Sequence, residues 1–482
     1  MTTTPVVSEK ERLELAGPEE LALVNAFFVL LKTAQYVDTS NATFQTQSAK
    51  FYLTFRRMAD EKGRVSIKIS DGRIFVCDKL VKFDSDGLVR ARIVSDVWQS
   101  LGIGGVAFDD SLDNRQIDKF VHLVATIKMT ERDHNRIAER LRELGIEGIT
   151  LFGMEQKTPQ PLLTAEKRSL LRRAARATFF RAISVVEDVM AQAAEDKEVD
   201  LSKARRVVHS LIDQIAEDES SLIELTSIRD FDEYTFAHST NVCVYALTMG
   251  IRLGMDRQRL SDLGFAALFH DIGKIKLPGD LIRKPDAFDE NDWAQMQRHP
   301  ILGAKTILRN LKFERNVARA ALVAFEHHIN EDFTGYPALT ARRPTNLFSK
   351  IIALVDTFDA LTSGRVYMKK AIPPDEVLRK MMYQMNIKFD AFLLKMFVSI
   401  IGIYPAGTLI LLSTDELAVV VQNNPENLAR PIVKIVGDRK GPHSEYMTVN
   451  LMLVENAERK IVRIIDPKKY NIDIKNILLS DR

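Results

Sequence analysis

The sequence predicts a mostly α-helical protein with a small α+β domain at its N-terminus and a small β-rich part at its C-terminus. Period-two alternation occurs near both ends, whereas apolar residues at helical spacing dominate residues 199–384. The length of 482 residues favours about three domains. Hydrophobic residues make up 46% of the chain and charged residues 27%, which is typical of globular proteins with substantial cores.

Residues 1–16 are expected to form a flexible tail, and residues 17–156 an α+β domain with a regulatory or assembly role. Strand-like runs lie on both sides of Asp71-Gly72, a pattern typical of a β-hairpin. Periodicity predicts helices at 21–31, 89–101, 114–129 and 136–144, and strands at 65–69, 73–76, 106–108 and 149–152.

A linker follows this domain. Two prolines, Pro159 and Pro161, interrupt the periodicity, and a long helical pattern then runs through 165–194. Residues 157–198 are therefore expected to form a linker helix. Its apolar stripe should pack on another helix, either within the chain or across a dimer.

The helical region at 199–385 is the expected catalytic domain. Beyond it, residues 386–482 are expected to form one helix and a small β-rich subdomain. The predicted helix covers 389–401, and the predicted strands cover 408–412, 416–421, 432–436 and 461–465.

Composition and charge exclude several classes of protein. The formal net charge of +2 gives no overall attraction to DNA, RNA or an acidic membrane. Cys77 and Cys243 are too few for a disulfide framework. Residues 1–15 lack the apolar core of a secretory signal, and the longest apolar runs, at 21–31 and 391–404, are too short to span a bilayer. We therefore expect a cytoplasmic protein with no membrane span and no nucleic-acid partner.

The chemistry is predicted by histidines and aspartates in the central region. Five of the nine histidines lie between residues 238 and 328, and one of them forms the adjacent pair His270-Asp271. Imidazole and carboxylate together suit Fe, Mn, Zn or Co, whereas Mg and Ca prefer oxygen ligands. A carboxylate such as Asp271 can also bridge two ions. The candidate ligands are His238, His270, Asp271, His299, His327, His328 and Asp356.

Two such ions, roughly 3.5–4 Å apart, can activate a water and clamp both oxygens of a phosphodiester during in-line displacement. The pattern therefore predicts a metal-dependent phosphohydrolase. His327 and His328 follow a helical run, and adjacent helical residues point about 100° apart. On this ground, one of the two histidines could serve each ion.

Several motifs resemble the HD-GYP branch of the HD-domain phosphohydrolases. The matching segments are 232–239, 270–274, 282–285, 298–300, 327–328 with 335–337, and 356–363 followed by Arg365. The resemblance covers about residues 222–370. It implies an all-helical HD-type catalytic bundle and a phosphodiesterase that hydrolyses the bacterial second messenger cyclic di-GMP to pGpG or GMP. Residues 389–421 also resemble the C-terminal extension found after many HD-GYP domains.

The resemblance implies a ligand set for two divalent ions, with Fe or Mn as the expected metals. One ion would be bound by His238, His270, Asp271 and Asp356. Asp271 would bridge to a second ion, bound by His299, His327 and His328. Family members with a third ion carry Glu four residues before the first His, where this chain has Tyr234. A hydroxide bridging the ions would attack phosphorus.

The resemblance also implies two catalytic residues, Asp271 and Lys274, with Lys274 contacting the scissile phosphate. The implied substrate contacts are Lys274, Lys284, Pro285, Gly335, Tyr336, Pro337, Arg365 and Lys369. Tyr336 could stack on a guanine base or act as a packed structural aromatic.

Three departures from the family pattern bear on the substrate. Ile329 replaces a usual Glu, Phe333 replaces a usual Gly, and Asp286 adds a carboxylate near the expected phosphate path. Because Phe does not adopt left-handed dihedrals cheaply, the loop around Phe333 is expected to differ in shape. Hydrolysis of another cyclic nucleotide or dinucleotide therefore stays open. A second alternative is a catalytically weak module that acts by binding a ligand or a partner. Its partner could be a second copy of the chain, in a homodimer, or another signalling protein.

Overall fold

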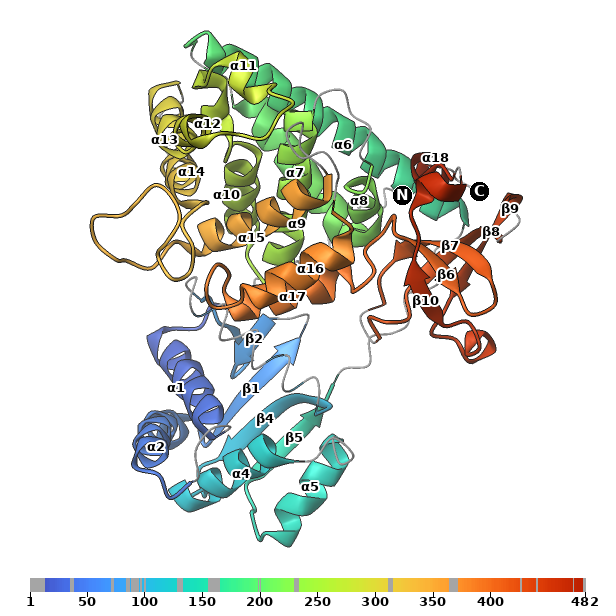
Figure 1. Cartoon of the computed structure of the whole chain (residues 1–482). Coiled ribbons are helices and arrows are strands. Elements are labelled where there is room, and N and C mark those ends of the chain that lie inside the picture. Colours follow the sequence, from blue (N-terminus) through green and yellow to red (C-terminus); the bar gives the residue numbers. More distant parts are fainter. Residues whose placement is uncertain are drawn as a thin grey trace, which may run out of the picture. The chain divides into compact units, whose positions relative to one another are not determined.

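The chain forms two compact units, Met1–Pro161 and Leu162–Arg482, in a computed structural model (Figure 1). No helix in the described part of the chain is long and apolar enough to cross a membrane. The structure describes residues 14–34, 39–70, 73–83, 87, 95, 98, 101–127, 133–154, 165–197, 199, 201–228, 234–310, 315–363, 372–424, 427–438, 441–470 and 472–479.

The first unit is an antiparallel sheet in the order β3-β2-β1-β4-β5, packed with helices (Figure 1). Its core is aromatic, because Phe108 of β4 packs edge-on against Phe27, Phe51 and Phe120 at centroid distances of 5.8 Å. The elements are α1 (Pro18–Ala34), α2 (Ala42–Lys62), β1 (Arg64–Ser70), β2 (Arg73–Val76), β3 (Lys79–Leu80), β4 (Ile103–Asp109), α4 (Asn114–Thr126), α5 (His134–Glu143) and β5 (Ile149–Gly153).

The predicted α+β character of this unit is confirmed. Strands β1 and β2 pair antiparallel with Ser70 opposite Arg73, as the predicted hairpin requires, although Asp71 and Gly72 themselves lie outside the described residues. Most of the helix predicted at 89–101 also lies outside them. Helix α2 was not predicted, although Asn41 caps it by accepting from Thr43 N at 2.8 Å.

The second unit begins with a helical bundle. Helix α9 is buried along most of its length, and it packs against α6, α10 and α15. The helices are α6 (Ala165–Ala194), α7 (Ser202–Glu217), α8 (Glu219–Leu225), α9 (Tyr234–Arg252), α10 (Arg257–Leu268), η2 (Ile272–Lys276), α11 (Gly279–Ile282), α12 (Glu290–Met296), α13 (His299–Asn310), α14 (Arg315–Glu326), α15 (Leu347–Ser363), α16 (Pro374–Tyr383) and α17 (Ala391–Ile401).

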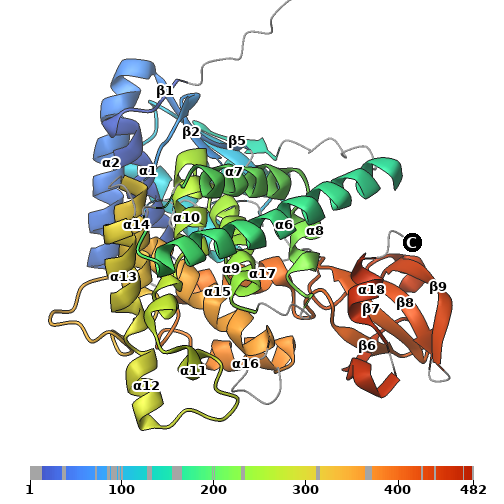
Figure 2. The same cartoon turned by 90° about the horizontal axis from the view of Figure 1, so that it is seen from above.

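The long helix α6 has its packing partners within the chain. Its apolar stripe, which includes Leu171, Phe179 and Val186, is buried against α7, α8 and α9 (Figure 2). The sequence analysis allowed a packing partner within the chain or across a dimer, and the structure shows partners within the chain.

The chain ends in a second antiparallel sheet, in the order β10-β6-β7-β8-β9. Alternate residues of β6 join two separate buried clusters, with Leu409 and Leu411 in one and Ile410 and Leu412 in the other. The elements are β6 (Leu409–Leu412), β7 (Glu416–Gln422), β8 (Ile432–Asp438), β9 (Gly441–Asn450), η3 (Val454–Asn456), β10 (Ile461–Ile464), η4 (Pro467–Tyr470) and α18 (Ile474–Leu479). The predicted fold class, mostly α with α+β and β-rich ends, is confirmed.

Candidate metal centre

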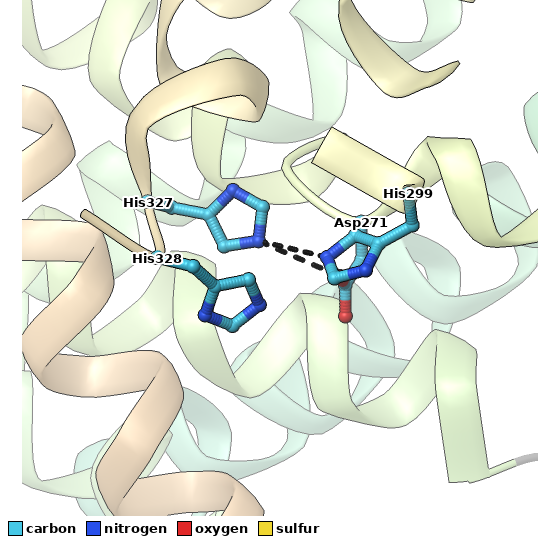
Figure 3. A group of neighbouring side chains, drawn as sticks. All are labelled: Asp271, His299, His327 and His328. Carbon is cyan, nitrogen blue, oxygen red and sulfur yellow. Dashed lines mark hydrogen bonds and ion pairs between the residues drawn. The ribbon is translucent and has the colours of Figure 1, made fainter. Parts of the chain in front are cut away.

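Five segments of the helical bundle bring seven histidine and aspartate side chains together. His238 comes from the first turns of α9 and Asp356 from the middle of α15, while the others lie at helix ends. The side chains form two groups, and within each group one ligand atom per residue lies within 4.8 Å of the others. The first group is His238, His270, Asp271 and Asp356. The second group, drawn in Figure 3, is Asp271, His299, His327 and His328.

Asp271 belongs to both groups and turns one carboxylate oxygen toward each. Its Oδ2 lies 3.7 Å from His238 Nε2 and 3.4 Å from His270 Nε2. Its Oδ1 lies 3.2 Å from His299 Nε2 and 3.7 Å from His327 Nε2. A bridging carboxylate needs this division, with one oxygen available to each of two cations.

Three histidines are oriented by backbone carbonyls. The Nδ1 atoms of His270, His299 and His327 lie 2.7, 2.7 and 2.9 Å from the carbonyl oxygens of Ala267, Met296 and Ala324. A carbonyl only accepts, so each Nδ1 carries the proton and donates it, and in the neutral ring the Nε2 lone pair is left for a ligand. In all three residues Nε2 faces the cluster.

His238 is oriented by a side chain that the sequence analysis missed. Its Nδ1 lies 2.7 Å from Asp359 Oδ2, and the Asp359 side chain is buried. Asp359 lies three residues after Asp356 on α15, so both carboxylates share one helix face. That spacing was the available signal, since a carboxylate one turn from a candidate ligand is well placed to bind a ligand histidine.

Gly273 allows η2 to pack backbone to backbone against the start of α13. A Cβ atom at this position would lie 2.0 Å from the carbonyl oxygen of His299 and 2.4 Å from Gly303 N. The side chains of Asp271 and Lys274, on either side of Gly273, are thereby fixed next to His299. The Lys274 ammonium forms an ion pair with Asp271 Oδ2.

The electrostatics of the cluster favour a cation. Burial tends to raise the pKa of Asp271, but the charges of Lys274 and His270 outweigh it and hold that pKa well below its usual range. Burial lowers the pKa of His299 to about 4. Burial also lowers the pKa of His270, but the Asp271 carboxylate outweighs it and raises the value to about 10. Near neutral pH the shared carboxylate is ionised and His299 is neutral, which are the forms that bind metal, whereas His270 carries a proton that a bound ion would displace.

His327 and His328 both belong to the group that contains His299. The expectation from helical geometry, that each would serve a different ion, is therefore wrong. Helix α14 ends at Glu326, so the two histidines lie in a turn in which the helical angle between neighbours does not apply. Their imidazole centroids are 4.1 Å apart (Figure 3).

The loop after His328 returns to it. Tyr336 N donates to the carbonyl oxygen of His328 at 3.2 Å, and a Cβ atom at Gly335 would lie 2.2 Å from that oxygen. Phe333 has a φ of 67°, so it adopts the left-handed conformation that is unfavourable for Phe. Hydrogen bonds from Phe333 N to Asn330 O and from Asn330 N to Thr334 O, of 3.0 and 2.9 Å, enforce the turn.

The predicted substrate contacts are distributed unevenly around the cluster. The Tyr336 ring lies 4.6 Å from that of His328, so Gly335, Tyr336 and Pro337 lie beside a candidate ligand. The Lys284 amine pairs with Asp292 of α12, and Pro285 follows it in the loop before α12. The added carboxylate of Asp286 is exposed. Arg365 and Lys369 lie outside the described residues.

Glu326 closes the base of the loop that carries His327 and His328. Its buried carboxylate accepts from Asn346 N at 3.0 Å and from Ser349 Oγ at 2.8 Å, and it pairs with Arg343 at 2.5 Å. Both ends of the loop are therefore joined through one side chain.

Replacing Glu326 with alanine is expected to lower the free energy of unfolding by about 1–3 kcal/mol, because it leaves buried donors unsatisfied. It should also weaken metal binding by the histidines of this loop. Denaturant unfolding and metal analysis of the purified variant measure the two effects. Glu331→Gln is the matched control, because the pair of Glu331 with Lys350 is partly exposed and should contribute at most ~1 kcal/mol. Equal effects of the two substitutions would contradict the role given to Glu326.

The chain matches two known domain families. Residues 188–393 match the HD domain, and residues 409–472 match a KOW domain associated with the HD domain. The first match contains every candidate metal ligand. The second covers the C-terminal sheet, which the sequence analysis predicted only as a β-rich extension.

Three curated relatives match parts of this chain. The chain is 31% identical to a cyclic di-GMP phosphodiesterase of Pseudomonas aeruginosa over 53% of this chain and 60% of the relative. It is 28% identical to a cyclic di-GMP phosphodiesterase response regulator of Xanthomonas campestris over 56% of this chain and 72% of the relative. It is 34% identical to a 3'3'-cGAMP-specific phosphodiesterase of Vibrio cholerae over 33% of each chain.

The chain thus spans about 60% of the length of the Pseudomonas relative and a third of the Vibrio relative. On the evidence of the domain match, the relatives and the motifs, residues 188–393 form an HD domain that is similar to those of the HD-GYP group.

Proposed function

We propose that this protein is a phosphodiesterase that hydrolyses cyclic di-GMP to pGpG or GMP with two divalent ions, Fe or Mn. The observation that carries the proposal is the position of Asp271 between two histidine groups, with one oxygen toward each. Imidazoles with carboxylates suit these metals. The relatives are phosphodiesterases named for cyclic di-GMP or 3'3'-cGAMP, which supports a cyclic dinucleotide as the substrate class.

The roles of the ligand residues follow from their positions. His238, His270 and Asp356 would hold one ion, His299, His327 and His328 the other, and Asp271 both. When bound, two such ions lower the pKa of water and neutralise charge on the phosphate. The ligands themselves are buried apart from His328, which is partly exposed, so substrate should approach from the side of His328 and Tyr336.

Among the described residues, Lys274 is the cation best placed to act on the substrate. Its side chain is 17% exposed while its ammonium pairs with the buried Asp271, so it lies at the border between the cluster and solvent. From there the ammonium could contact a non-bridging oxygen of the reacting phosphate and stabilise charge that develops on it. Gly335, Tyr336 and Pro337 would line the same approach beside His328.

The proposal is tested with protein purified without metal and reloaded with Mn²⁺ or, anaerobically, with Fe²⁺. Reloaded protein should convert cyclic di-GMP to pGpG or GMP, and the metal-free protein should not. Metal analysis of the same sample gives the occupancy. Full occupancy without turnover would contradict the proposal and favour a module that binds its ligand without hydrolysing it.

A second substrate is favoured by one observation, the 34% identity to a phosphodiesterase named for 3'3'-cGAMP. Compared with cyclic di-GMP, 3'3'-cGAMP would present the same phosphodiester linkages to the metal centre and differs in one base. Competition between cyclic di-GMP and 3'3'-cGAMP in a single reaction would decide between them, since the ratio of kcat/KM values measures preference directly.

A further inference from the structure

The two metal groups are unequal in charge. We infer that Asp359 makes the His238 group the tighter of the two sites, so that the protein fills this group first and the His299 group second. The inference rests on the proposed two-metal function and concerns the order and affinity of loading.

Asp359 is fixed by hydrogen bonds to both of its oxygens. Oδ2 lies 2.7 Å from His238 Nδ1, and Oδ1 accepts from Asn241 Nδ2 at 2.9 Å. Asn241 is itself buried on α9, three residues after His238. Because both neighbours donate, both oxygens of Asp359 act as acceptors, and His238 keeps its Nε2 toward the cluster.

The partner of His238 differs in charge from those of the other oriented histidines. His270, His299 and His327 donate Nδ1–H to neutral carbonyls, whereas His238 donates to a carboxylate. A carboxylate behind a ligand histidine raises the basicity of its free nitrogen and fixes the ring. His238 should therefore be the strongest imidazole donor of the cluster.

The buried carboxylates are concentrated in the same group. Asp356 lies within the His238 group, with Oδ1 3.1 Å from His238 Nε2, and Asp359 lies directly behind it. In the part of the chain that the structure describes, the other group has three imidazoles and no carboxylate beyond the shared Asp271. The Lys274 ammonium pairs with that shared carboxylate, so its positive charge should lower the affinity for both ions. Two additional carboxylates in a buried site attract a cation strongly, because solvent screens them little.

Exposure adds a kinetic difference. All four residues of the His238 group are buried, whereas His328 in the other group is partly exposed. Solvent and chelators can therefore reach the second group more readily. An ion there should exchange faster than one held between Asp271 and Asp356.

The test is a Mn²⁺ titration of the full-length metal-free protein, in which the EPR signal of free Mn²⁺ counts the bound ions. Wild-type protein should bind two ions in two resolved steps. Asp359→Asn keeps the size of the side chain and removes its charge. It should weaken the first step by roughly 10–100-fold and change the second step little.

Asp262→Asn is the matched control, because Asp262 is another buried carboxylate, on α10, that pairs with Arg319 outside the cluster. It should leave both steps unchanged. Asn241→Ala removes the second donor to Asp359 and should weaken the first step less than Asp359→Asn does. Thermal unfolding of the metal-free protein shows whether Asp359→Asn folds. If it does not fold, an unchanged first step in Asn241→Ala would overturn the inference and a weakened first step would support it.

Two equal steps in the wild type would overturn the inference, as would an unchanged first step in Asp359→Asn. Weakening confined to the second step would overturn it as well. The titration needs no turnover, so its result is separate from that of the proposed function. A protein that binds the two ions in the expected order but does not cleave cyclic di-GMP would contradict the proposed phosphodiesterase activity. It would leave the inferred order of metal binding intact.

Discussion

Asp271→Asn is expected to lower hydrolysis of cyclic di-GMP by on the order of 1000-fold. Asparagine keeps the shape of the side chain but offers a single neutral oxygen, so it cannot present one carboxylate oxygen to each group. A metal ion contributes several kcal/mol of charge stabilisation, and each 1.36 kcal/mol is a factor of ten in rate. Steady-state kinetics of the metal-loaded variant, together with its metal content, measures the effect.

The effect of Asp271→Asn should be specific to the bridging position. Asp262→Asn again serves as the control, because it removes a buried carboxylate nine residues earlier that contacts Arg319 and Gln258 rather than the histidines. It should retain most of the activity. Asp271→Asn protein that binds two ions and turns over like the wild type would show that Asp271 does not bridge.

Gly273→Ala is expected to have the second largest effect. The added Cβ would lie 2.0 Å from a backbone oxygen of α13, so η2 and α13 must separate. Overpacking of this kind typically costs about 1–3 kcal/mol of the free energy of unfolding. Because the separation moves Asp271 and Lys274 away from His299, activity should fall more than stability alone explains. Denaturant unfolding and steady-state kinetics on one preparation measure the loss of stability and the loss of activity.

Gly279→Ala provides the comparison within the same segment. Its added Cβ would meet only the guanidinium end of Arg283, a flexible and exposed side chain that can move aside. Stability and activity should therefore change little. A Gly273→Ala protein as stable and active as Gly279→Ala would contradict the backbone packing that we assign to η2.

The metal cluster was the part of the site most accessible from sequence. Residue type alone identifies imidazole and carboxylate donors, and helical periodicity places them at helix ends, as in His270-Asp271 after α10 and His299 at the start of α13. Periodicity also predicted α6 and four of the five described strands of the C-terminal sheet. The strand β9 was missed, because Gly441–Asn450 begins with a Gly-Pro pair and lacks sustained apolar alternation.

The rest depended on tertiary contacts that no local pattern reports. Asp359 acts through a hydrogen bond to a residue 121 positions earlier in the chain. The grouping of His327 with His328 depended on where α14 ends, and helix ends are poorly determined by periodicity. Phe333 adopts a left-handed φ because the surrounding hydrogen bonds enforce it, which overrides the intrinsic preference of the residue.

The central claim is that one aspartate joins two metal ions. A crystal structure of the Mn²⁺-loaded protein, with anomalous scattering recorded near the Mn absorption edge, tests it most directly. We predict two anomalous peaks, one beside Oδ2 of Asp271 among His238, His270 and Asp356, and one beside Oδ1 among His299, His327 and His328. A single peak, or two peaks that both lie on one side of Asp271, would contradict the account.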